Sequence, residues 1–120
     1  MSTQKETVLQ FERRGPILVV RVQGSIELFS VENLRRQIDA AVGSAPTDAL
    51  VVSFAEVTLV DSTGLGLFIG LQKRLPEDCR MRLCEMSPSV RAMFEYARIF
   101  SRFEVDDSLA AALAALGATP

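Results

Sequence analysis

The chain has 120 residues, the size of one domain, and 48% of them are hydrophobic, which is enough for one full core. The formal net charge is -2, and the short Lys and Arg pairs are offset by nearby acids, so the chain lacks the basic surface of a nucleic-acid-binding protein. It contains no histidine, which removes the commonest general base and metal ligand and any Ser-His-Asp triad. No apolar run is long enough to cross a bilayer, and the polar start of the chain lacks the apolar region of a signal peptide. Composition therefore predicts a cytoplasmic protein that contacts neither nucleic acid nor a membrane.

The first third of the chain predicts two strands followed by a helix. Residues 7–13 alternate between apolar and polar side chains, and residues 17–22 are rich in β-branched side chains, so both stretches favour strands. A Gly-Pro turn signal between them favours an antiparallel hairpin. Apolar residues at helical spacing then predict a helix that begins at Ser30 or Asn33 and stops at the Gly-Ser-Ala-Pro cluster of residues 43–46.

The middle of the chain predicts a buried strand and a helix that contains glycine. Residues 49–54 are almost entirely apolar, as expected when both faces of a sheet are covered, and a shorter apolar run follows at residues 57–60. The helix after Ser62 contains Gly66 and Gly70 one turn apart on a common side. Glycine inside a helix costs about 1 kcal/mol relative to alanine, so this spacing predicts that another group approaches closely. That group is either a neighbouring strand of the same chain or a partner protein.

The last third predicts a strand, a helix, a short strand and a final helix. Residues 80–85 alternate and favour a strand, and the Ser-Pro pair after them is a strong helix start. The buried positions expected on that helix are Val90, Met93, Phe94 and Ala97. Residues 103–105 predict a short strand, and Asp106 or Asp107 is expected to cap a helix over residues 108–116.

These elements follow the order β-β-α-β-α-β-α-β-α. Such an order predicts one α/β domain over residues 1–120, with its core at about residues 7–116. After the initial hairpin, the alternation of strands and helices favours parallel pairing. The predicted sheet is therefore mixed but mainly parallel, with helices packed against it.

The two cysteines are predicted to be free thiols. Cys79 and Cys84 lie an odd number of positions apart, so on one strand they would face opposite sides. This spacing argues against a disulfide or a metal pair between them and fits a reducing compartment.

A short polar run separates the buried strand from the glycine-containing helix. Asp61, Ser62 or Thr63 can each cap the helix by accepting a free backbone N–H of its first turn. If Thr63 is the cap, Ser62 faces outward. The partial positive charge at a helix start favours an anion, so a hydroxyl placed there can accept a phosphoryl group without disturbing the fold.

The same run lacks the spacing of known catalytic loops. No Gly-x-x-x-x-Gly-Lys-Ser/Thr run occurs, which excludes a Walker loop. Gly64 and Gly66 fit a dinucleotide fingerprint, but Ile69 occupies the place of the third glycine. A nucleophile elbow would need glycine at Val60 and a histidine elsewhere. Ser62 is therefore better suited to receive a group than to attack one, and we predict no catalytic residue, metal or cofactor.

The run Asp-Ser-Thr-Gly-Leu-Gly at residues 61–66, after the Phe-Ala-Glu-Val-Thr-Leu-Val of residues 54–60, resembles the signature of the STAS family. More narrowly, the chain resembles the bacterial anti-sigma factor antagonists. The likeness spans about residues 7–116 and includes the corner at residues 24–27 and the segment at residues 83–90.

The resemblance implies a mechanism. An unphosphorylated antagonist binds an anti-sigma factor that is also a serine kinase, and this binding frees the sigma factor. The kinase phosphorylates the serine directly after the motif aspartate, which is Ser62 in this sequence, with Thr63 as the second choice. Phosphorylation ends the binding, and a metal-dependent serine phosphatase restores it. Such a chain is a binding protein rather than an enzyme, and we expect a monomer or a weak dimer.

We predict a partner-binding surface around this serine. Its residues are Glu27, Asp61, Ser62, Thr63, Gly64, Gly66 and Gly70. A phosphate adds about -1.5 to -2 charges beside the carboxylates of this surface, which would weaken an interface that covers it. Two other functions stay open: a STAS scaffold or transport accessory domain whose serine is never phosphorylated, and a small ligand-binding or phosphoryl-accepting enzyme.

The chain departs from the family pattern at two places. The first corner usually reads Gly-Glu-Leu/Ile-Asp, whereas residues 24–27 read Gly-Ser-Ile-Glu, so Ser25 replaces one carboxylate and Glu27 carries a longer one. The third helix usually ends in a turn that contains glycine, whereas residues 96–99 read Tyr-Ala-Arg-Ile. We therefore expect that helix end, around Arg98, to be built differently.

Overall fold

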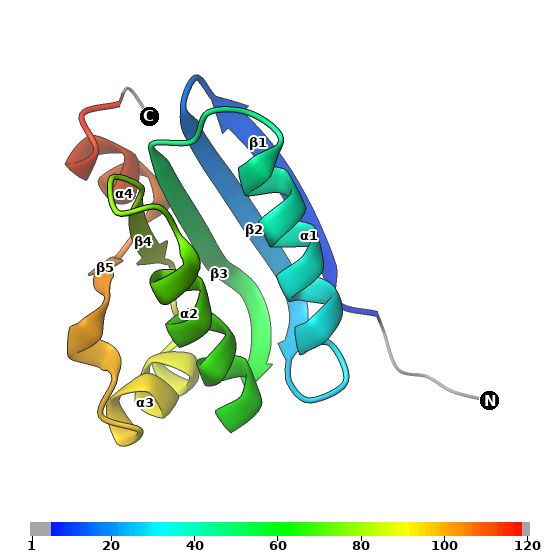
Figure 1. Ribbon diagram of the computed structural model, residues 1–120. Helices are drawn as coiled ribbons and strands as arrows, with labels where there is room; N and C mark the ends of the chain where they lie inside the picture. The colour runs from blue at the N-terminus through cyan, green and yellow to red at the C-terminus, as the bar shows by residue number, and fades with distance from the viewer. Residues whose placement is uncertain (1–5, 119–120) are drawn as a thin grey trace.

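Five strands form one mixed sheet in the computed structural model, which describes residues 6–118 (Figure 1). The strands are β1 (Val8–Arg14), β2 (Ile17–Ile26), β3 (Ala49–Val60), β4 (Arg80–Cys84) and β5 (Glu104–Asp106). They are ordered β1-β2-β3-β4-β5 across the sheet. β1 runs antiparallel to β2, and the other three pairs are parallel. The predicted α/β fold with a mixed, mainly parallel sheet is confirmed.

Helices cover both faces of this sheet, in the predicted chain order. They are α1 (Val31–Gly43), α2 (Ser62–Arg74), α3 (Pro88–Tyr96) and α4 (Leu109–Ala115), with a short 3-10 helix at Phe100–Arg102. Side chains of α1, α2 and α3 pack on one face of the sheet, and α4 packs on the other (Figure 1). The connections between parallel strands therefore run through helices, as a parallel sheet requires.

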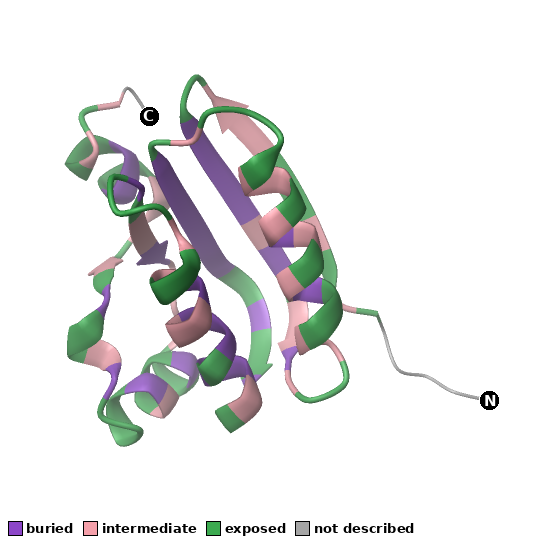
Figure 2. Cartoon of the chain, in the orientation of Figure 1, coloured by how far each residue is buried: buried purple, intermediate pink, exposed green. Residues whose placement is uncertain are grey.

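Alternate residues of β2 divide the core into two clusters. Leu18 and Val20 belong to the larger cluster under α1–α3, whereas Ile17 and Val19 belong to a smaller one under α4. Phenylalanine rings fill the larger cluster, with centroids 5.1 to 6.1 Å apart. Figure 2 shows that the central strands are buried along much of their length. This explains the almost continuous apolar runs in their sequences.

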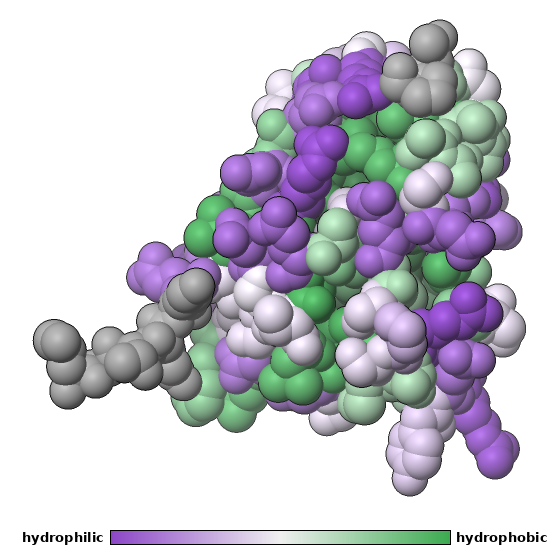
Figure 3. Space-filling model, turned by 180° about the vertical axis from the view of Figure 1, so that it is seen from behind, coloured by the Kyte–Doolittle hydropathy of each residue, from purple (hydrophilic) through white to green (hydrophobic). Residues whose placement is uncertain are grey.

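The sheet surface behind β1 and β2 is polar. Glu12 accepts hydrogen bonds from the guanidinium groups of Arg14 and Arg21, and the second of these bonds is 3.2 Å long. These hydrogen bonds lower the pKa of Glu12. Seen from behind in Figure 3, hydrophilic side chains are spread over the molecule and separate the hydrophobic areas. This face is therefore an ordinary solvated surface.

β2 and β3 are both longer than the sequence predicted. The expected strand over residues 17–22 continues to Ile26, and the two apolar runs before Asp61 form one strand. Irregularities in the β2–β3 pairing, between Arg21 and Gln23 and again between Gly24 and Ser25, let both strands bend and continue. Ile26 and Val60 consequently pair at the same edge of the sheet, next to Asp61.

One predicted helix start is confirmed and one predicted cap was wrong. α1 begins after Ser30, one of the two predicted starts, although the Ser30 hydroxyl donates to the Ser25 carbonyl at 2.9 Å and accepts no N–H of α1. α4 is capped by Ser108, whose hydroxyl accepts the Ala111 N–H at 3.0 Å. Asp106 ends β5 instead and accepts from Arg82 at 2.7 Å.

The end of α3 shows how the chain manages without the usual glycine. Arg98 adopts a left-handed conformation with φ of 61°. Its N–H donates to the Glu95 carbonyl, and the Ile99 N–H donates to the Phe94 carbonyl at 3.1 Å, which together form a Schellman turn. Ala97, predicted to be buried, is exposed because it lies at this turn. Arginine therefore occupies a position that glycine normally takes.

Both cysteines are buried and free, as predicted. Burial raises the pKa of Cys79, and burial of Cys84 raises its pKa to about 12, so both thiols stay protonated at neutral pH. Within residues 6–118, no three Cys, Asp or Glu residues come close enough together to hold a metal ion. Over the same part of the chain, every helix is too short or too polar to cross a membrane.

Candidate functional site at the start of α2

The carboxyl ends of β2 and β3 bring two distant segments of the chain together. β2 leads into the loop at residues 27–30, and β3 leads directly into α2. The Asp61 N–H donates to the Ile26 carbonyl at 3.2 Å, which joins the two chain segments where they leave the sheet. The corner and the motif that were singled out in the sequence therefore form one site.

Gly64 marks the closest backbone contact at this site. A β-carbon at this position would lie 2.3 Å from the Ile26 carbonyl oxygen and 3.0 Å from a methyl group of Val60. Because the oxygen belongs to the backbone of a buried strand, it cannot move aside cheaply. Only glycine allows the first turn of α2 to pack directly on the end of β2.

Asp61 is the cap of α2. Its Oδ1 atom accepts the Gly64 N–H at 2.8 Å, and its Oδ2 atom accepts the Leu28 N–H at 3.2 Å. Of the three side chains that the sequence offered, Ser62 and Thr63 are therefore not the cap. Both carboxylate oxygens are engaged by backbone amides, so Asp61 is not oriented as a base toward its neighbour.

Ser62 is the first residue of α2 and is exposed, whereas Thr63 is half-buried. Within the described residues, the Ser62 hydroxyl has no hydrogen-bond partner. A phosphoryl group attached here would point into solvent at a helix start, where partial positive charge favours an anion. The arrangement can present a hydroxyl for modification, and it has no base of its own to activate that hydroxyl.

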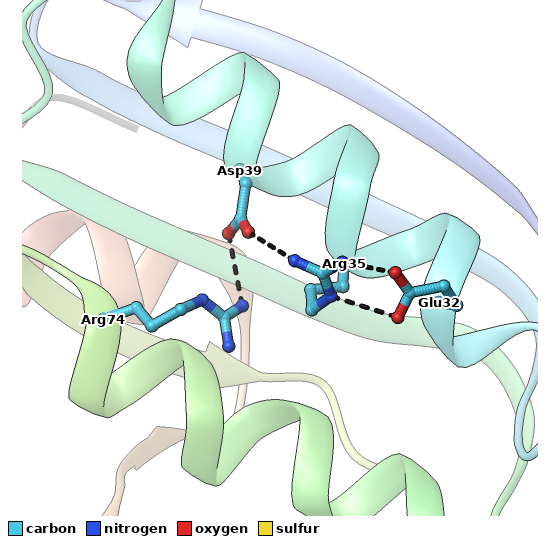
Figure 4. Close-up of polar contacts among 4 residues, drawn as sticks. All are labelled: Glu32, Arg35, Asp39 and Arg74. Atoms are coloured by element: carbon cyan, nitrogen blue, oxygen red, sulfur yellow. Dashed lines mark hydrogen bonds and ion pairs between the residues drawn. The ribbon is translucent and has the colours of Figure 1, made fainter.

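Gly66 and Gly70, the two later glycines of α2, do not face a strand of the same chain. Of the two groups predicted to approach them, a neighbouring strand and a partner protein, the strand is therefore excluded. Nothing lies within 4 Å of a β-carbon built on Gly66, which is exposed. A β-carbon on Gly70 would meet only the Arg74 guanidinium, at 2.8 Å. The same guanidinium donates to Asp39 of α1 at 3.2 Å (Figure 4). Gly70 thus makes room for an ion pair between α1 and α2, while Gly66 leaves a flat, open surface.

Three exposed apolar side chains lie on the two chain segments that meet at this site, and sequence reasoning missed them. Leu28 is 61% exposed, Phe29 is 87% exposed and Leu59 is 53% exposed. Phe29 and Leu59 also line a groove of about 710 Å³ beside the loop. We call Leu28, Phe29, Leu59 and Ser62 the docking edge. The Leu-Phe pair between Glu27 and the start of α1 could have revealed it, because a loop seldom needs two consecutive large apolar side chains.

Glu27 shapes the loop that carries this pair. Its Oε1 atom accepts the Phe29 N–H at 3.2 Å, and its backbone N–H donates to the Ser30 hydroxyl at 3.0 Å. The longer side chain at this corner can fold back on its own loop. Glu27 and Asp61 therefore both bond the backbone of the 27–30 loop, and both bring negative charge to the site.

Comparison with known proteins agrees with this architecture. The profile of the STAS domain family matches residues 8–112. The anti-sigma F factor antagonist of Paenibacillus polymyxa is 25% identical to this chain over 109 residues, which cover 90% of this chain and 93% of that protein.

Solved structures share the fold at lower identity. An anti-sigma factor antagonist from Mycobacterium paratuberculosis superposes with a TM-score of 0.87 at 23% identity, over 98% of this chain and 99% of that one. The unphosphorylated form of the antagonist SpoIIAA superposes with a TM-score of 0.75 at 22% identity, over 94% of this chain and 100% of the other. Its phosphorylated form, described as a Bacillus cell fate determinant, gives 0.67 at 21% identity, over 91% and 99%. Since the family profile extends from β1 into α4, the chain belongs to the STAS domain family.

Proposed function

We propose that this protein is an anti-sigma factor antagonist that is switched by phosphorylation of Ser62. In its unphosphorylated form it binds an anti-sigma factor serine kinase and so releases the sigma factor. The observation that carries this proposal is the exposed Ser62 hydroxyl, left free because Asp61 caps α2, at the same end of β2 and β3 as three exposed apolar side chains. The similarity to anti-sigma factor antagonists supports the same role.

The docking edge provides the contact area for such a partner. Phe29 is a large, exposed aromatic side chain, the residue type that commonly anchors protein interfaces when it enters a pocket of the partner. Leu28 and Leu59 add further exposed apolar surface, and Leu59 lines the same groove as Phe29. Burial of apolar surface stabilises a complex by roughly 25 cal/mol per Å² before the cost of association. Glu27, Thr63 and the exposed Gly66 belong to the proposed surface as its surroundings. Gly64 is buried against the end of β2 and Gly70 faces the Arg74 guanidinium, so these two predicted surface residues are not expected to contact the partner.

A phosphate on Ser62 would end this binding through charge. It adds about -1.5 to -2 charges at pH 7, next to Asp61 and on the side of the molecule that carries Glu27. Like charges forced together in a desolvated interface cost several kcal/mol, and each 1.4 kcal/mol reduces affinity about tenfold. The fold itself would tolerate the group because Ser62 faces solvent. A serine phosphatase that removes the phosphate would restore binding, and the whole cycle would run in the cytoplasm with a monomeric antagonist.

Phosphorylation is tested by incubating the protein with a cognate anti-sigma factor kinase and ATP, followed by intact-mass spectrometry. We expect the mass of one phosphate on the wild-type chain and no added mass on Ser62→Ala. A phosphate found on Thr63 instead would move the switch by one residue. An unmodified wild-type chain that still binds the kinase would support the STAS scaffold function instead.

Binding is tested by calorimetry with the same kinase. We expect Ser62→Asp to weaken binding at least tenfold, because it places a fixed negative charge at the docking edge. Ser89→Asp is the matched control, since Ser89 is an exposed serine in the first turn of α3. Full binding by Ser62→Asp, or equal losses in both variants, would contradict the proposal.

A further inference from the structure

We propose that the Asp61 carboxylate ties the exposed Leu28–Phe29 segment to the start of α2, and that a phosphate on Ser62 loosens this tie. The inference rests on the proposed function, because it concerns how modification of Ser62 changes the docking edge. It adds a change of shape to the change of charge. Asp61 is then a positioning residue that acts through the loop, rather than a residue that itself contacts the partner.

Most hydrogen bonds of the loop do not involve Asp61 or α2, which distinguishes the bond between the Leu28 N–H and the Asp61 carboxylate. The Glu27 carbonyl accepts the N–H groups of Ser30 and Val31, and the Glu27 side chain accepts the Phe29 N–H, so these bonds stay within the loop and the start of α1. The Ser30 hydroxyl bonds the Ser25 carbonyl at the end of β2. Among the described residues, only the bond from the Leu28 N–H to Asp61 connects residues 27–30 to α2.

A phosphate on Ser62 would compete with this arrangement. No described residue accepts the backbone N–H groups of Ser62 and Thr63, so both are free to bond a phosphate attached at this position. The phosphate dianion would then lie beside the Asp61 carboxylate, and the two groups repel. The carboxylate holds the Gly64 N–H at 2.8 Å but the exposed Leu28 N–H at 3.2 Å. The longer, solvent-exposed bond is the one we expect to open.

Opening the tie would change how the apolar side chains are presented. Leu28 and Phe29 are 61% and 87% exposed, so packing holds neither in place. Without the bond to Asp61, a partner would have to order the loop as it binds, and ordering flexible segments reduces affinity. Phosphorylation of Ser62 would therefore weaken binding in two ways, through charge repulsion with the partner and through loss of order in the Leu28–Phe29 segment.

The isolated protein is sufficient to test this inference. Phosphoserine is incorporated at position 62 during translation, and amide hydrogen exchange at Leu28 is followed by NMR. We expect exchange about tenfold faster than in the unmodified chain, together with an upfield shift of the Leu28 amide proton. Asp61→Ala should produce the same two changes without any phosphate. If Asp61→Ala does not fold, Asp61→Asn replaces it. The two amides bond different carboxylate oxygens, and asparagine replaces one of these acceptors with an NH2 donor.

Two controls separate the tie from general effects. Ser87→Ala removes the cap of α3 without touching the loop, and phosphoserine at position 89 adds the same charge at the start of α3. Neither should change exchange at Leu28. Unchanged Leu28 exchange in the Ser62 phosphoprotein, or in both Asp61 variants, would overturn the inference. Since no kinase is present, that result would leave the proposed binding function to its own calorimetric test.

Discussion

α2 and α3 both begin where a parallel strand has ended, yet their first residues are used differently. At α3, the Ser87 hydroxyl accepts the Val90 N–H at 3.2 Å and serves as the cap. At α2, the Asp61 carboxylate accepts the Gly64 N–H at 2.8 Å, and the serine after it stays exposed and unbonded within the described residues. The comparison teaches that a serine at a helix start is open to modification only when another side chain does the capping.

The third helical position differs as well. Val90 occupies it in α3 and is buried in the core, whereas Gly64 occupies it in α2 and faces the Ile26 carbonyl oxygen. α3 is thus anchored by a side chain and α2 by direct backbone contact with the sheet. The first turn of α2 is therefore packed against the end of β2 at Gly64, while Ser62, on the side of the helix that faces solvent, remains free. Three sets of substitutions test this contrast.

The largest effect is expected from Gly64→Ala. The added methyl group overlaps the Ile26 carbonyl oxygen, so the free energy of unfolding should fall by roughly 1–3 kcal/mol or more. Gly66→Ala is the matched control in the same helix. Its methyl group meets nothing within 4 Å, so better helix propensity should raise stability by up to about 1 kcal/mol. Chemical denaturation measures both, and effects of the same sign would contradict the close contact at Gly64.

Removal of the two caps should have intermediate and unequal effects. Ser87→Ala loses one neutral hydrogen bond and should cost about 1 kcal/mol. Asp61→Ala loses two bonds to a charged acceptor and the favourable interaction with the helix dipole, so we expect about 2 kcal/mol. Thermal and urea unfolding of both variants check this order. Equal losses would mean that the charge of Asp61 and its bond to the Leu28 N–H together add nothing to stability.

The smallest effect is expected from Ser62→Ala. An exposed side chain without a hydrogen bond should change the free energy of unfolding by no more than about 0.5 kcal/mol. The same substitution at Ser87 is the natural comparison, because both are serines at a helix start. A loss at Ser62 as large as that at Ser87 would show that its hydroxyl takes part in capping.

Much of the fold could be predicted from short-range pattern. The hairpin, the apolar β3, the Ser-Pro start of α3 and the free thiols all depend on residues close together in the chain, and each is confirmed. The cap of α4 and the length of β2 could not be predicted with the same rules. Ser108 and Asp106 are both plausible caps by type, and β5 decides between them by engaging Asp106.

The sequence alone determined the order of elements, the family resemblance and the importance of the run at residues 61–66, because these are properties of local pattern. Tertiary structure decided the role of each residue within that run. Asp61 caps α2 and also binds the Leu28 amide, from a loop 33 positions away. Gly64, rather than Gly66 or Gly70, is the glycine that a neighbouring strand requires. Both outcomes depend on how close the end of β2 lies to the start of α2. The sequence pattern within either segment cannot predict that distance, because the folded sheet sets it.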